Sequence, residues 1–238
     1  RKNGDSEYVK NIMNSEIELN NFNLSPGKYV LSADIQSVNK ILEGKETVLL
    51  GEHIKVIRPR VHRIGVDSGL EALEIGAADI PERGYIDKPK KAVLLGDVMP
   101  NDNYAKPSDI VLIAKGSAGK VGIVPSSVPG FGKGGWVVGQ SAIILRVDSD
   151  RIDANSLLVY LRSNIGQSLL KSITSGSTIP FIKFSDLKEL RIIIPDAKSK
   201  ERISKILKRE DSISKQVKEL QLEQLTLTDN IWNTKEKQ

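Results

Sequence analysis

The C-terminal part of the chain places the strongest limit on its fold. No glycine or proline follows Pro195, and a seven-residue repeat continues from there toward the C-terminus. Seven of the nine positions in its two interleaved rows are apolar, and this sustained spacing is typical of a coiled-coil helix. One row holds Ile203, Glu210, Val217, Gln224 and Ile231, and the other holds Ile206, Ile213, Leu220 and Leu227.

A helix over residues 197–234 would be roughly 57 Å long at about 1.5 Å per residue. Such a helix is too long for a small globular domain to cover by itself, so the sequence predicts a partner helix. We expect the partner to contact the apolar positions of the repeat, here called the seam: Ile203, Ile206, Ile213, Val217, Leu220, Leu227 and Ile231.

Several short motifs precede this helix. Residues 175–180 form a turn-rich hexapeptide, residues 185–190 contain a helix start, and residues 191–194 are an aliphatic strand candidate. Farther upstream, residues 155–170 have the pattern of an amphipathic helix, with Leu158, Leu161, Ile165 and Leu169 on one face.

Two apolar runs at residues 108–113 and 121–124 flank a glycine-containing turn. This pattern predicts two buried strands joined by a glycine-rich hairpin. The sequence of this turn nearly matches the phosphate-binding loop motif, but Ala114 replaces its first glycine and Val121 replaces its final serine or threonine. The sequence then continues as a strand, without a helix N-terminus to face a phosphate. A nucleotide site is therefore excluded.

These motifs, in this order, resemble the target recognition domain and conserved helix of type I restriction-modification specificity subunits. The resemblance covers roughly residues 48–231. It implies an α+β fold, in which a mixed α/β target recognition domain precedes a long coiled-coil helix. It also implies a DNA-recognition subunit with no catalytic site, metal or cofactor of its own. Such a subunit directs a methyltransferase subunit and a motor-nuclease subunit on duplex DNA.

One recognition domain followed by one helix resembles half of a full specificity subunit, in which two such units pair their helices antiparallel. We therefore expect a homodimer through antiparallel helices, or docking onto a methyltransferase helix bundle. Glu210 and Gln224 lie fourteen residues apart around Val217, and polar seam residues set the register of a coiled coil at a cost in stability. Antiparallel pairing centred near Val217 would bring Glu210 toward Gln224 of the partner subunit.

The first 46 residues differ from the rest. Residues 23–30 combine asparagine, Ser-Pro and glycine, which is turn chemistry. The run resembles the end of an adenine-N6 DNA methyltransferase subunit, and it fits a plain linker equally well. The adenine-flipping motifs of such methyltransferases, Asn-Pro-Pro-aromatic and Asp-Pro-Pro-aromatic, do not occur in this sequence. If the resemblance holds, the catalytic part is therefore not contained in it. We divide the chain into a connector (1–46), a recognition domain (47–195) and a helix (196–238). An alternative to a separate specificity subunit is that the chain is the C-terminal recognition region of a longer fused methyltransferase or restriction enzyme.

Composition narrows the classes of site. The net charge is +5 with a pI near 9.2, which permits nucleic-acid binding without demanding it. The absence of cysteine excludes disulfides, thiolate zinc sites and cysteine nucleophiles. His53 and His62 are the only histidines, and we expect surface or loop positions for both. No apolar run reaches the about 18 residues of a membrane span, and no signal peptide is present at the start, so a cytoplasmic protein is expected.

Ten polar side chains are the candidate DNA contacts. Most are basic residues near prolines or glycines, where a loop could place them against phosphates. They are Arg58, Arg60, Arg63, Lys88, Lys90, Lys91, Lys115, Ser117, Lys120 and Lys133. Lys133 belongs to residues 129–136, where four glycines predict the most flexible segment of the chain. Their cost in backbone entropy is the cost expected of a loop that moulds to a ligand.

Two other classes of protein remain as alternatives. A nuclease needs clustered acids near a lysine, and the nearest such run, residues 109–115, lacks a second acid. Serine hydrolysis needs a histidine partner, and neither histidine has a supporting context. A coiled-coil scaffold that binds protein is the other class, and a steep salt dependence of duplex binding would weigh against it. The basic clusters and the family resemblance favour DNA.

Overall fold

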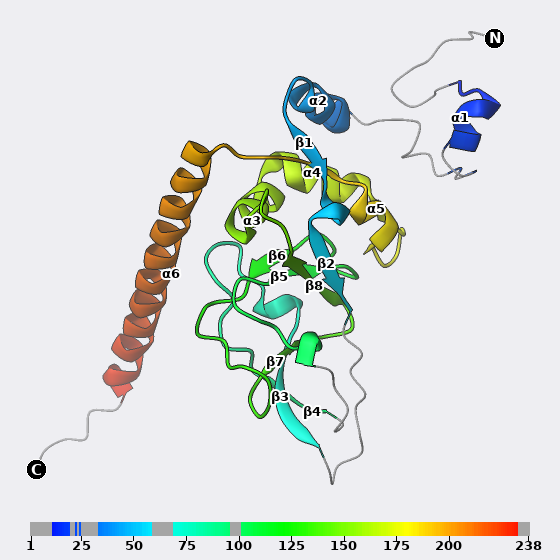
Figure 1. The fold of residues 1–238 in the computed structure, drawn as a ribbon. Helices are drawn as coiled ribbons and strands as arrows, with labels where there is room; N and C mark the ends of the chain where they lie inside the picture. The colour runs from blue at the N-terminus through cyan, green and yellow to red at the C-terminus, as the bar shows by residue number, and fades with distance from the viewer. Residues whose placement is uncertain are drawn as a thin grey trace, which may run out of the picture.

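The structure is a computed structural model of the 238-residue chain, and it describes residues 11–19, 22, 24, 33–58, 69–95 and 101–232. A body of strands carries several short helices at one end, and one long helix, α6, lies along its side (Figure 1). The expected mixed α/β fold followed by a long C-terminal helix is confirmed.

A four-stranded antiparallel sheet forms the centre, in the order β2 (Ile54–Ile57), β8 (Ala142–Val147), β5 (Ile110–Ile113) and β6 (Val121–Ile123). The predicted hairpin is confirmed, because β5 pairs antiparallel with β6. Every residue of β5 is fully buried. Ile110 and Leu112 belong to the larger hydrophobic core, and Val111 and Ile113 belong to a second one. The sheet is therefore covered on both faces, which explains why β5 reads as a continuous apolar run.

A three-stranded sheet covers one of those faces, in the order β4 (Lys91–Leu95), β3 (Leu70–Ile75) and β7 (Trp136–Val138). Strands β3 and β7 are parallel. The next strand along the chain, β8, belongs to the central sheet, so β7 and β8 lie in different sheets. The turn between them is held to the end of β3, because the Gly139 N–H donates to the Ile75 carbonyl at 3.0 Å.

Helices α2 (Ala33–Leu42), α3 (Ala154–Arg162), α4 (Asn164–Ser172) and α5 (Phe184–Lys188) gather at the other end. The prediction of one helix over residues 155–170 is wrong, because the chain breaks at Ser163. That residue is extended, and its Oγ accepts a hydrogen bond from the Gly166 N–H at 3.2 Å. The expected apolar face is confirmed: Leu158, Leu161 and Leu169 are buried and Ile165 is partly buried.

Two short strand pairs complete the body. β1 (Thr47–Leu49) pairs with β11 (Arg191–Ile193), so segments far apart in sequence lie side by side. β9 (Thr174–Ser175) pairs with β10 (Phe181–Ile182) around the turn-rich hexapeptide. A further short helix, α1 (Asn14–Leu19), lies in the N-terminal segment. Val38 of α2, a helix that the sequence did not predict, joins the larger core.

The long helix α6 (Ala197–Trp232) packs one face against its own domain. Leu207 is only 3% exposed, and Ile203 is partly buried against the same core. Polar contacts continue along this face, where Glu210 lies 3.9 Å from Arg83 and Lys218 pairs with Asp87. Leu207 lies outside the heptad seam, but Ile203 and Glu210 belong to its first row, so the domain covers the start of that row. The later seam residues lie on another side of the helix.

Candidate nucleic-acid interface

One end of the central sheet collects four of the ten candidate side chains. Ile57 of β2 and Ile113 of β5 lie opposite Ile144 and Ala142 of β8. Strands β2 and β5 therefore finish at the end where β8 begins. The hairpin between β5 and β6 turns at that same end. Four exposed candidates follow or precede these strand ends, and we call them the hairpin-end group: Arg58, Lys115, Ser117 and Lys120.

The hairpin has a fixed shape. Gly116 and Gly119 have φ angles of +79° and +95°, in the left-handed region that favours glycine. The Gly119 N–H donates to the Ile113 carbonyl at 2.9 Å, and the Gly116 N–H donates to the Pro180 carbonyl at 2.8 Å. The side-chain amide of Gln167 on α4 donates to the Gly119 carbonyl at 3.2 Å. The hairpin and the turn-rich hexapeptide, separate motifs in the sequence, therefore lie side by side.

Arg58 lies over an aromatic ring. Its guanidinium carbon is 3.4 Å from the centroid of Phe184, a cation–π contact that holds the side chain in place. An open cleft of about 390 Å³ beside it is also lined by Lys55 and Lys188. These two lysines were not among the sequence candidates. The signal for Lys55 was present, because it alternates with the buried Ile54 along β2.

The cleft is not purely cationic. Asp102 lies 2.8 Å from the Lys55 Nζ and 3.0 Å from the Lys106 Nζ. Hydrogen bonds from these two ammonium groups lower the pKa of Asp102 well below its usual range. The Asp102 carboxylate thus offsets part of the charge of Lys55, and Arg58 and Lys188 are the cleft cations that lie outside this cluster.

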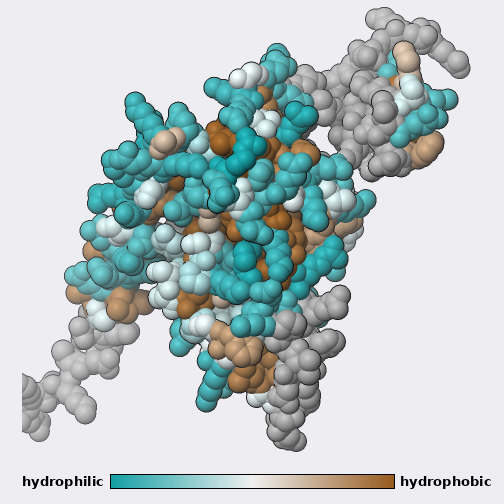
Figure 2. Space-filling model, in the orientation of Figure 1, coloured by the Kyte–Doolittle hydropathy of each residue, from teal (hydrophilic) through white to brown (hydrophobic). Residues whose placement is uncertain are grey.

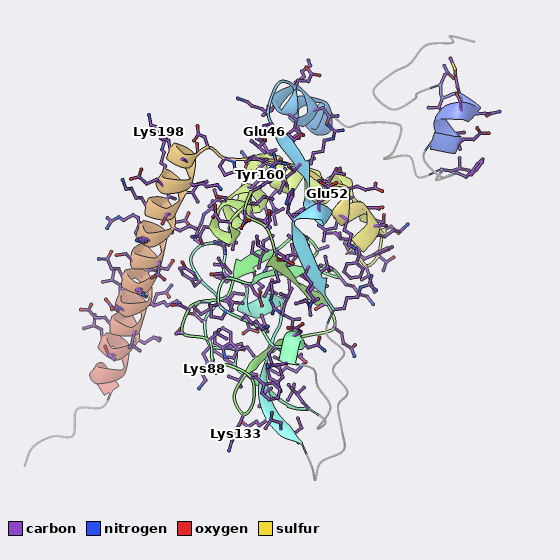
Figure 3. All side chains as sticks on the ribbon, viewed as in Figure 1. Glu46, Glu52, Lys88, Lys133, Tyr160 and Lys198 are labelled. Carbon is purple, nitrogen blue, oxygen red and sulfur yellow. The ribbon has the colours of Figure 1, made fainter. Side chains whose placement is uncertain are left out.

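The other described candidates surround the three-stranded sheet. Lys88 and Lys90 are exposed before β4. Lys91 pairs with Glu74 across the β3–β4 ladder, and Glu74 is 7% exposed. Lys133 lies in the glycine-rich loop before β7. Figure 3 shows Lys88 and Lys133 in the lower half of the domain, away from the helical end. We call Lys88, Lys90, Lys91 and Lys133 the sheet group.

The structure therefore brings the candidates together in two groups and leaves some undescribed. Arg60, Arg63 and His62 lie outside the described residues, as does the side chain of Ile231. His53 is part-buried, and its Nδ1 lies 2.8 Å from the Ser149 Oγ. No group of three His, Cys, Asp or Glu residues that could hold a metal ion occurs within the described part of the chain.

A third surface lies on α6. Five seam residues are between 44% and 62% exposed: Ile206, Ile213, Val217, Leu220 and Leu227. They recur at heptad spacing on a different side of the helix from Leu207. Figure 2 shows hydrophobic residues among hydrophilic ones on the lower part of this helix. Such an apolar stripe is a liability for an isolated protein and typically marks an interaction site. Among the described helices, none is long and apolar enough to cross a membrane.

The chain is similar to known restriction-modification proteins. The family model of the type I restriction modification DNA specificity domain matches residues 87–226. A comparison with curated proteins gives no match. Among solved structures, the HsdS subunit from Thermoanaerobacter tengcongensis is similar at 22% identity, covering 76% of this chain and 40% of that one, with a TM-score of 0.46.

Two further solved structures are similar. The type I restriction-modification S subunit from M. genitalium matches at 19% identity over 75% of this chain and 41% of that one, with a TM-score of 0.42. The type IIG restriction endonuclease BpuSI matches at 9% identity over 82% of this chain and 30% of that one, with a TM-score of 0.53. The chain thus spans between about a third and half of the length of the structures that it matches.

The specificity-domain model covers Lys115 and Lys120 of the hairpin-end group, the glycine-rich loop before β7, the turn-rich hexapeptide and most of α6. This match includes more than half of the chain. The chain therefore belongs to the family of type I restriction modification DNA specificity domains.

Proposed function

We propose that this protein recognises a specific duplex DNA sequence and directs adenine methylation and restriction by partner subunits. The observation that carries the proposal is the specificity-domain match over residues 87–226. The exposed cations of the hairpin-end group and the sheet group supply contacts of the kind that position a protein on phosphates. Because the proposed ligand is chromosomal or invading duplex, the proposed place of action is the cytoplasm.

The proposal assigns a task to each part of the chain. Residues 47–195 read the DNA, residues 196–238 bind a partner, and residues 1–46 form an N-terminal connector whose helix α2 packs on the domain core through Val38. The chemistry belongs to a methyltransferase subunit and a motor-nuclease subunit, with no metal or cofactor held by this chain. The exposed seam on α6 supports a helical partner, either a second copy of this chain in antiparallel pairing or the methyltransferase.

Selection from a random-sequence duplex library tests this function. The purified protein should enrich one sequence motif, and its affinity for the enriched duplex should fall steeply with salt because phosphate contacts release counterions. Lys115→Ala and Lys120→Ala should each weaken binding by about threefold to tenfold and lower the salt slope by about one. Lys198→Ala is the matched control, because Lys198 lies at the start of α6, outside both groups of candidate contacts (Figure 3).

Enrichment of no motif, together with equal affinity for unrelated duplexes, would overturn sequence recognition. Unchanged affinity in the two hairpin variants would place that group outside the interface. Transfer of a methyl group from S-adenosylmethionine to the enriched duplex by this chain alone would contradict the assignment of the chemistry to partner subunits.

A further inference from the structure

Phe131 protrudes from the glycine-rich loop that precedes β7. Its side chain is 60% exposed, although the loop lies next to a hydrophobic core that could have buried it. A large apolar side chain in this position gains little from burial, so burial does not account for it. Lys133, two residues further along, is also exposed and projects from the same end of the domain (Figure 3).

The loop that carries these two residues is held in one shape. The Gly134 N–H donates to the Glu71 carbonyl at 2.8 Å, and the Leu73 N–H donates to the Gly135 carbonyl at 2.9 Å. The loop is therefore bonded to the edge of β3. Gly135 leaves no room for a side chain, because a Cβ there would lie 2.7 Å from the Tyr104 ring and 2.8 Å from the Gly130 carbonyl oxygen. Because the loop is already ordered in the free protein, ligand binding would not have to supply the conformational entropy cost of ordering it.

Tyr104 braces the Phe131 ring from one side. The ring centroids are 5.1 Å apart at an interplanar angle of 73°, an edge-to-face arrangement. Tyr104 is itself only 2% exposed, so the brace belongs to the core. The Phe131 ring therefore contacts Tyr104 while most of its side chain remains exposed. A ring in this position can make an apolar contact with a surface, whereas insertion between stacked bases would have to break its contact with Tyr104.

We propose that Phe131 makes an apolar contact with the 5-methyl group of a thymine in the major groove, while Lys133 binds the adjoining phosphate. This inference rests on the proposed function. Thymine is the base that presents a methyl group in that groove, and phenylalanine is among the side chains that recognise it by apolar contact. Phosphate contacts position the protein, and base contacts supply the specificity. The two residues therefore divide these tasks between them.

The test compares the motif enriched from a random-sequence duplex library by the wild-type protein and by four variants. Phe131→Ala should lose preference for thymine at one position of the motif and bind the wild-type duplex about tenfold more weakly. Phe131→Leu should retain part of the preference, because leucine keeps an apolar contact. Lys133→Ala should weaken binding to all duplexes alike and lower the salt slope by about one. Leu222→Ala, at a side chain that is 64% exposed on α6, is the control and should change neither.

Replacement of thymine by uracil at that one position should weaken wild-type binding by about fourfold, since it removes a single methyl group. The same replacement should leave Phe131→Ala binding unchanged. An unchanged motif and affinity in Phe131→Ala, with a normal thermal unfolding midpoint, would overturn this inference and leave sequence recognition standing. A fluorescent 2-aminopurine signal of base unstacking that depends on Phe131 would overturn it in favour of insertion. A wild-type protein that enriches no motif would overturn both proposals.

Discussion

The carboxylate of Asp109 is held at two points by the guanidinium of Arg146. The Arg146 Nε lies 2.8 Å from Oδ1 and the Nη2 lies 2.7 Å from Oδ2. Asp109 is 2% exposed and also accepts the Lys106 backbone N–H at 2.7 Å. The hydrogen bond from Arg146 to Asp109 raises the pKa of Arg146. This pair ties β8 to the turn that enters β5, so Asp109 is occupied by a structural contact.

Replacement of Asp109 by alanine should lower the free energy of unfolding by about 3 kcal/mol, because it leaves the Arg146 guanidinium largely buried without its carboxylate. Denaturant titration measures this loss. Asp148→Ala is the control: Asp148 is exposed, and a surface substitution of this kind changes stability by less than about 0.5 kcal/mol. The double variant Asp109→Leu with Arg146→Met should recover part of the loss, since apolar replacements of a buried pair are often tolerated.

The contact of α6 with its own domain depends on Leu207. Truncation of this side chain, which is 3% exposed, should cost about 2 to 5 kcal/mol of stability. The same truncation at Leu222, which is 64% exposed, should cost less than about 0.5 kcal/mol. Equal unfolding midpoints for Leu207→Ala and Leu222→Ala would mean that α6 does not pack on the domain in solution.

Close packing between α3 and α4 requires glycine at position 166. A Cβ on Gly166 would lie 2.1 Å from the Tyr160 carbonyl oxygen and 2.6 Å from the Leu161 Cα. These are backbone atoms that cannot rotate away, so Gly166→Ala should destabilise the domain by about 2 kcal/mol or more. Gly130→Ala, where nothing lies within 4 Å, should be close to neutral. The comparison uses thermal unfolding, and a neutral Gly166→Ala would show that the two helices can separate without cost.

The sequence predicted those elements that depend on a pattern of neighbouring residues. The β5–β6 hairpin follows from two aliphatic runs around glycines, and the extent of α6 follows from its repeat. The break at Ser163 had a readable signal as well: serine three residues before Gly166 can cap a helix, as its contact with the Gly166 N–H shows. The amphipathic pattern continued through the break because α3 and α4 bury their apolar faces in the same core.

Relationships between distant segments could not be predicted in this way. Nothing near Leu73 indicates that β3 runs parallel to β7, and nothing near Val48 indicates that β1 pairs with β11. The buried face of α6 is a similar case, because the position of Leu207 depends on the shape of the domain beneath it. Each candidate DNA contact follows from the local pattern of its own loop, whereas the division of these residues into a hairpin-end group and a sheet group depends on the fold.

The seam of α6 gives the last prediction. Ile206 and Ile213 are 44% and 45% exposed, and Leu220 and Leu227 are 61% and 62% exposed. Burial of this stripe against a second helix would remove the exposed apolar surface that the domain leaves uncovered, because the domain covers only the Leu207 side. We therefore expect a dimer at micromolar concentration, measured by sedimentation equilibrium.

The double variant Val217→Asp with Leu220→Asp should raise the dimer dissociation constant at least about a hundredfold, because each helix would bury unpaired charges in the seam. Leu222→Asp carries its charge on an exposed residue outside the seam and should leave the dimer intact.

Cross-linking tests the register of the two helices, because antiparallel pairing centred near Val217 places the two copies of that position opposite each other. Val217→Cys should therefore cross-link to its own copy on oxidation, whereas Ile206→Cys, eleven residues from the centre, should not. A wild-type protein that sediments as a monomer, with the same mass in the double aspartate variant, would exclude the homodimer. The methyltransferase would then be the partner, because the exposed seam would have no second copy to cover it.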